Sequence, residues 1–163
     1  MLPDPLHPAM VHFPIVLTFL LPLAAFGALW HGRRNPGVRT GWMLTTALAG
    51  ALTASAWLAV ETGEGEEDLV ERVVPDAPLE AHEEAAERFL LLSGGVLLLA
   101  GAGLLRNRIG TAARLATTAG SVGLVVAGAL VGHSGGELVY RHGAAAAHTQ
   151  IELGRVPRGS PED

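Results

Sequence analysis

The chain has 163 residues, of which 49% are hydrophobic and only 17% charged, and its formal net charge is -5 at pH 7. In soluble domains roughly a quarter of all residues are charged, so this composition favours a membrane protein. The chain has no cysteine, which excludes disulfides, thiolate metal sites and covalently anchored c-type haem, and its acidic balance gives no support to nucleic-acid binding.

Four apolar runs are long enough to cross a hydrocarbon layer, which takes about 20 helical residues. They cover residues 10–30, 41–60, 89–105 and 112–132. Leu, Ala, Gly and Val dominate these runs, without the period-2 alternation of barrel strands. Residues 1–10 contain Asp4 but no Lys or Arg, and no short apolar region with a cleavage site follows, so we expect the first run to remain in the mature protein. The sequence predicts an all-α, four-helix transmembrane bundle.

The helix ends are predicted from local stop and start signals. Thr62-Gly63 predicts the end of the second helix, and Asp76 with Pro78 predicts the start of the third near Leu79. Gly135-Gly136 predicts a break after the fourth helix. The predicted membrane domain covers residues 1–148, with helices at about 10–30, 41–60, 79–105 and 112–132, and we expect residues 149–163 to form a polar, disordered tail.

Charge predicts the orientation of the bundle. The two connections rich in arginine follow the first and third helices, whereas the connection after the second is predicted to be a long acidic loop with Glu64, Glu66, Glu67 and Asp68. The arginines are Arg33, Arg34, Arg39, Arg106, Arg108 and Arg114. By the positive-inside rule they face the cytoplasm, so we expect a multi-pass protein of the bacterial inner membrane with both termini on the external, periplasmic side.

Six of the seven histidines then share the external side, and only His31 lies inside. The six are His7, His12, His82, His133, His142 and His148. Imidazole is the commonest biological metal ligand, and polar groups near a bilayer core are costly unless they are used. This asymmetry is the main sequence clue to function.

The external end of each helix has one candidate ligand. These are His12, Glu61, His82 and His133. For haem b, which needs two axial imidazoles, the predicted pair is His82 with His133, and His12 is the replacement partner. A non-haem ion such as Zn, Fe, Ni or Cu would instead take His12, His82 and His133 with a carboxylate from Glu61 or Glu83. His7 and His142 are predicted accessory groups, and a structural histidine layer with no cofactor is the third alternative.

Residues 7–14 read H-P-A-M-V-H-F-P, and residues 135–143 read G-G-E-L-V-Y-R-H-G. These two motifs resemble the patterns H-P-x-x-V-H-F-P and G-G-x-L-V-Y-x-H-G of a bacterial family of predicted four-helix membrane proteins classed as a domain of unknown function. Thr62-Gly63 and His82 match further family positions. The resemblance implies the four-helix architecture, and the fusion of some relatives to cytochrome c modules implies redox work.

No catalytic motif supports an enzyme. The chain has no phosphate loop, dinucleotide fingerprint or His-Glu-x-x-His motif. We therefore expect a membrane protein that binds haem b near its external face and transfers electrons, with a non-haem metal protein or a membrane scaffold as alternatives. The expected partners are the lipid bilayer and a periplasmic cytochrome or a quinone, and a homo-oligomer is compatible with the sequence.

Overall fold

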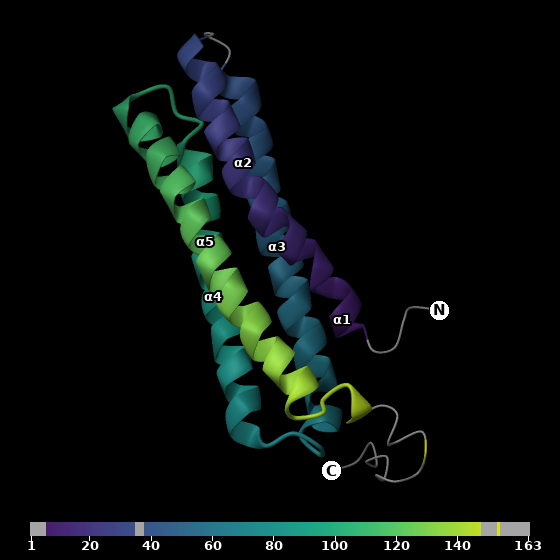
Figure 1. The fold of residues 1–163 in the computed structure, drawn as a ribbon. Coiled ribbons are helices and arrows are strands. Elements are labelled where there is room, and N and C mark those ends of the chain that lie inside the picture. Colours follow the sequence, from purple (N-terminus) through teal and green to yellow (C-terminus); the bar gives the residue numbers. More distant parts are fainter. Residues whose placement is uncertain (1–5, 35–37, 148–152, 154–163) are drawn as a thin grey trace.

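The computed structural model describes residues 6–34, 38–147 and 153. Within this part of the chain the fold is all-α, which confirms the predicted class. Its helices are α1 (His7–Met10), α2 (His12–Arg34), α3 (Val38–Val70), α4 (Asp76–Ala102) and α5 (Arg108–Tyr140). The four long helices run alternately up and down in an elongated bundle (Figure 1).

Four segments of the described chain are long and apolar enough to cross a membrane: His7–Gly32, Thr40–Val70, Asp76–Ala102 and Arg108–Tyr140. The bilayer core is about 30 Å thick, and 33 helical residues extend about 50 Å. Because α3 and α5 have 33 residues each, they project beyond the hydrocarbon layer. The projecting ends provide room for a site outside the lipid.

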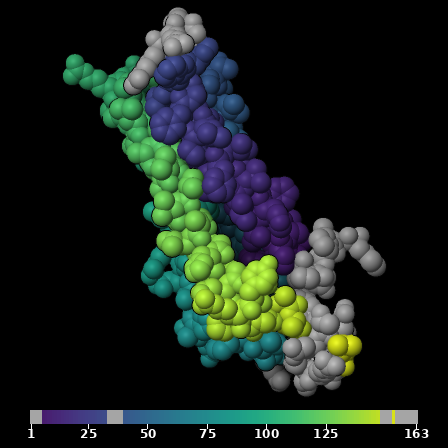
Figure 2. Space-filling view, in the orientation of Figure 1, coloured from purple at the N-terminus to yellow at the C-terminus, as the bar shows by residue number. Residues whose placement is uncertain are grey.

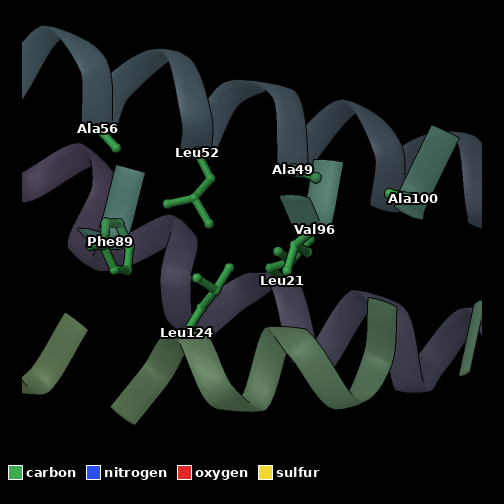
Figure 3. Close-up of a cluster of buried hydrophobic side chains, with 8 residues drawn as sticks. All are labelled: Leu21, Ala49, Leu52, Ala56, Phe89, Val96, Ala100 and Leu124. Carbon is green, nitrogen blue, oxygen red and sulfur yellow. The ribbon is translucent and has the colours of Figure 1, made fainter. Parts of the chain in front are cut away.

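Each long helix packs against two neighbours, since α2 contacts α3 and α5, and α4 contacts α3 and α5. The core between them is built from small and branched aliphatic side chains and one aromatic ring, that of Phe89 (Figure 3). Its buried members are Leu21, Ala49, Leu52, Ala56, Phe89, Val96, Ala100 and Leu124. Many large apolar side chains point outward instead, among them Leu91 and Leu98 at 75% and 77% exposure, as expected for a surface that contacts lipid.

Buried hydroxyls lie on all four long helices, but they are satisfied locally. Thr18, Thr45 and Thr117 each donate to the carbonyl four residues earlier, at 2.7, 3.1 and 2.8 Å. Such bonds remove the cost of an unpaired polar group in an apolar interior. These side chains therefore allow close packing of the helices.

Trp42 stabilises the arginine-bearing end of the bundle, where α2 ends and α5 begins. Its side chain is fully buried, and its indole Nε1 donates to the carbonyl of Ala100 at 2.9 Å. The guanidinium of Arg114 lies 5.8 Å from the ring centroid and donates through Nε to the carbonyl of Gly103 at 2.6 Å. This contact covers the carbonyls at the end of α4, which have no partner within the helix.

Two predicted helix ends are wrong. α3 continues through Thr62-Gly63 to Val70, so the predicted acidic loop after residue 60 is helical, and α5 continues through Gly135-Gly136 to Tyr140. Glycine costs only about 1 kcal/mol in a helix relative to alanine, and packing of the projecting turns offsets that. The other bounds shift less: α4 begins at Asp76 and ends at Ala102, and α5 begins at Arg108 after an Asn107 cap.

The first helix begins earlier than predicted and is broken once. α1 begins at His7, Val11 separates it from α2, and Pro14 is buried three residues later. Proline has no N–H, so Pro14 leaves the carbonyl of Met10 without its helical donor. The predicted tail and His148 lie outside the described residues, with Leu153 as the exception.

Candidate functional site

A cavity of about 700 Å³ lies at the end of the bundle where α3 ends and α4 begins. We call this end of the bundle the histidine end. In the space-filling view, the last turns of α5 and the segment after it gather there beside the start of α4 (Figure 2). Its lining is His7, Pro8, Ala59, Val60, Gly63, Glu64, Glu66, Glu67, Val70, Leu79, His82, Glu83, Ala86, Glu87, Gly135, Leu138, Val139, Ala144 and Ala145. The volume is within the range of small-molecule and cofactor sites.

His7 reaches the cavity from α1 and is held by α3. Its Nδ1 lies 2.8 Å from the carbonyl oxygen of Ala59 and 3.4 Å from Oγ1 of Thr62. Its backbone N–H donates to Oε1 of Glu66 at 2.9 Å, and the N–H of Leu6 donates to the same oxygen at 2.7 Å. A β-carbon at Gly63 would lie 3.3 Å from the imidazole, so glycine there lets the ring approach the helix.

His82 reaches the cavity from the second turn of α4 and is held by α5. Its Nδ1 lies 2.9 Å from Oγ of Ser134, whose hydroxyl donates to the carbonyl of Val131 at 3.0 Å. A β-carbon at Gly135 would lie only 3.0 Å from Cε1 of His82. One of the two neighbours of this imidazole, Gly135, thus belongs to the glycine pair that the sequence suggested as a helix break.

The hydrogen bonds assign one tautomer to both neutral rings. A carbonyl oxygen only accepts, so Nδ1 of His7 donates to Ala59. The Ser134 hydroxyl proton is used on Val131, so Ser134 accepts from Nδ1 of His82. With Nδ1 protonated in each ring, the lone pair is on Nε2. Metal-ligating histidines in proteins are commonly oriented by such an Nδ1–H bond.

The charge around the cavity is one-sided. Five glutamates line it, namely Glu64, Glu66, Glu67, Glu83 and Glu87, and its described lining contains no arginine. The apolar side chains from all of the surrounding helices, including Leu79 and Leu138, form the rest of the wall. The site therefore combines an apolar interior, two imidazoles and a negative potential that attracts cations.

Of the sequence-predicted site residues, the structure places His82, Glu83 and the accessory His7 in the cavity lining. His12 is exposed on α2 and contacts the carbonyl of its own Pro8 at 2.8 Å. The side chain of His133 is 74% exposed, with Nε2 3.8 Å from Oε1 of Glu137. It borders a separate shallow groove on the outside of α5.

Glu61 and His142 also lie outside the cavity lining; Glu61 is exposed and His142 is half-buried. The four predicted metal ligands His12, Glu61, His82 and His133 are therefore not brought together around the cavity. Within the described residues, no group of three or more His, Asp or Glu side chains is arranged to hold a metal ion.

Sequence reasoning missed the residues that hold the two imidazoles. On α3 these are Ala59, Thr62, Gly63 and Glu66, and on α5 they are Ser134 and Gly135. The α3 set has the i, i+3, i+4, i+7 spacing of one helix face. That signal was hidden because the helix was predicted to stop at this point.

Comparison with known proteins gives the family but no activity. A family model described as "Predicted membrane protein (DUF2231)" matches residues 3–148. No curated protein and no solved structure matches the chain. Since the match covers most of the 163 residues and the fold has four membrane-length helices, the chain belongs to the DUF2231 family of predicted membrane proteins.

Proposed function

We propose that this membrane protein binds haem b in the histidine-end cavity, with His7 and His82 as the axial ligands, and uses it for electron transfer. One observation supports the proposal most strongly. Two imidazoles from separate helices line a single cavity, and Nδ1 of each is already held in a hydrogen bond. Haem supplies one-electron redox chemistry, while the protein sets its ligands and surroundings.

The number of ligands favours haem over a bare ion. Zinc and similar ions need three or four protein ligands. Haem iron is completed by two axial ligands, because the macrocycle supplies the other four. Two imidazoles line one cavity of about 700 Å³, so their number supports haem. His82 remains from the sequence-based pair, and His7 replaces His133, whose side chain is 74% exposed outside the cavity lining.

A divalent cation is the second candidate. Five glutamates and no arginine line the described cavity, which favours a cation and opposes the propionates of haem. In that case the side chains of His7, His82 and Glu83 would rearrange and bind the ion together. The candidate ions remain Zn, Fe, Ni and Cu.

The acidic surface also suggests a partner. Exposed carboxylates continue from the cavity onto Glu61 of α3, Glu71 in the turn after α3 and Glu80 at the start of α4. Glu84 is exposed too but pairs with Arg88. Such a surface accelerates association with a basic protein and makes it sensitive to salt. We propose a basic periplasmic cytochrome as the electron partner, which requires the N-out, C-out orientation in the inner membrane that the arginines predict.

An absorption spectrum and a metal analysis of the purified protein distinguish these candidates. Protein produced with ample haem supply and purified in detergent should show a Soret band and the split visible bands of six-coordinate haem b on reduction. Stoichiometric Zn, Fe, Ni or Cu without these bands would favour the cation. The absence of both signals would refute the proposal and would favour a scaffold with a structural histidine layer.

A further inference from the structure

We propose that Glu66 is the positioning residue of this site: its carboxylate docks α1 onto α3 and so holds His7 in the cavity. The docking follows from the geometry alone. Its consequence for ligand binding rests on the proposed function. Glu66 Oε1 lies 2.7 Å from the N of Leu6 and 2.9 Å from the N of His7, although about 60 residues separate them in sequence.

Apolar burial cannot hold α1 in place. The helix has four residues, and none of them is buried. Val11 keeps helical backbone angles and joins α1 to α2, but Pro14 has no N–H for the carbonyl of Met10, so the junction has one helical hydrogen bond fewer. The position of α1 against α3 therefore depends on the polar contacts between them.

Those contacts occupy one face of α3. Ala59 accepts from the His7 ring, Gly63 lies against the ring, and Glu66 accepts from the backbone at the start of α1. Positions 59, 63 and 66 are one and two turns apart on a helix. The same face thus binds both the imidazole and the backbone of His7, which fixes the side chain relative to the cavity.

Among these contacts, Glu66 provides the charged acceptor. The first N–H groups of a helix have no partner within the helix, and a carboxylate there also meets the positive end of the helix dipole. A hydrogen bond to an ionised acceptor is roughly twice as strong as a neutral one. Removal of this carboxylate would leave two half-buried donors without Oε1 as their acceptor, and the docked state would lose most of its advantage.

Amide hydrogen exchange tests the docking without any ligand. The N-terminal peptide is well suited, because Pro3, Pro5 and Pro8 have no amide hydrogen and leave few amides beside those of Leu6 and His7. In the full-length protein in detergent, Glu66→Ala should accelerate exchange at these two amides by about tenfold or more. Glu66→Gln keeps a side-chain oxygen acceptor and should retain most of the protection.

Glu64→Ala is the matched control. Glu64 lies on the same helix and lines the same cavity, so its removal changes the local charge equally while the bonds to Leu6 and His7 remain. Glu64→Ala should leave the exchange of the Leu6 and His7 amides unchanged. Unchanged exchange in Glu66→Ala, or equal acceleration in Glu64→Ala, would refute the docking role.

Titration of the same variants with haem tests the consequence. Glu66→Ala should weaken haem binding by about tenfold and lose the six-coordinate spectrum, as we expect for His7→Ala, whereas Glu66→Gln should restore both. Faster exchange together with unchanged haem affinity would overturn the positioning role. Faster exchange in a protein whose wild type binds no haem would support the docking and refute the proposed function instead.

Discussion

Gly135 lies directly against the imidazole of His82. A β-carbon at this position would stand 3.0 Å from Cε1 of the ring, tighter than ordinary van der Waals contact, whereas a β-carbon at Gly136 would meet no atom within 4 Å. Two adjacent glycines in the same helix thus differ in what they do. Gly135 makes room for a site residue, and Gly136 faces open space.

Gly135→Ala should therefore displace the His82 ring. We expect overpacking to destabilise the folded protein by about 1–3 kcal/mol and to weaken haem binding in the cavity. Thermal unfolding in detergent and haem titration measure the two effects. In the control Gly136→Ala, stability should stay the same or rise by up to about 1 kcal/mol through helix propensity. Equal behaviour of the two variants would contradict the close contact.

The other end of the bundle offers a parallel comparison. A β-carbon at Gly103 would overlap the indole nitrogen of Trp42, while one at Gly101 would meet nothing within 4 Å. Gly103→Ala should push Trp42 from its buried position and break its hydrogen bond to Ala100. We expect the free energy of unfolding to fall by about 3 kcal/mol or more and the tryptophan emission to change. Gly101→Ala should show neither effect. A stable Gly103→Ala variant with unchanged emission would show that Trp42 is not packed in this way.

The sequence was sufficient to predict four helices, because long runs of Leu, Ala, Gly and Val with few charges are diagnostic of membrane spans. It also predicted that His82 and His133 lie at similar depth. Depth follows from residue number, but the side of the helix does not. Ser134 and Gly135 face His82, whereas His133, one residue and about 100° earlier, faces outward with Glu137.

The glycines were the second source of error. Thr62-Gly63 and Gly135-Gly136 were predicted as helix ends because glycine is common there. In the structure Gly63 and Gly135 lie inside α3 and α5, where the missing side chain accommodates His7 and His82. A local rule cannot detect this use, since the partner of each glycine is more than 50 residues away in the sequence.

Membrane topology gives a prediction that is independent of any ligand. The connections next to Arg34 and Arg106 should face the cytoplasm. A reporter active only in the periplasm should therefore work when fused after Asp163 and fail when inserted at Asn35. The reverse pattern would place the histidine end in the cytoplasm and exclude a periplasmic electron partner.

The most direct test of the account is the reduced absorption spectrum of four single histidine variants, prepared with ample haem supply. If His7 and His82 are the axial ligands, His7→Ala and His82→Ala should each lose the six-coordinate haem b bands, since removal of a ligand weakens retention strongly. His12→Ala and His133→Ala should keep them, because both side chains are exposed and lie outside the cavity lining. Loss of the bands in His133→Ala, with His7→Ala unaffected, would contradict the assignment.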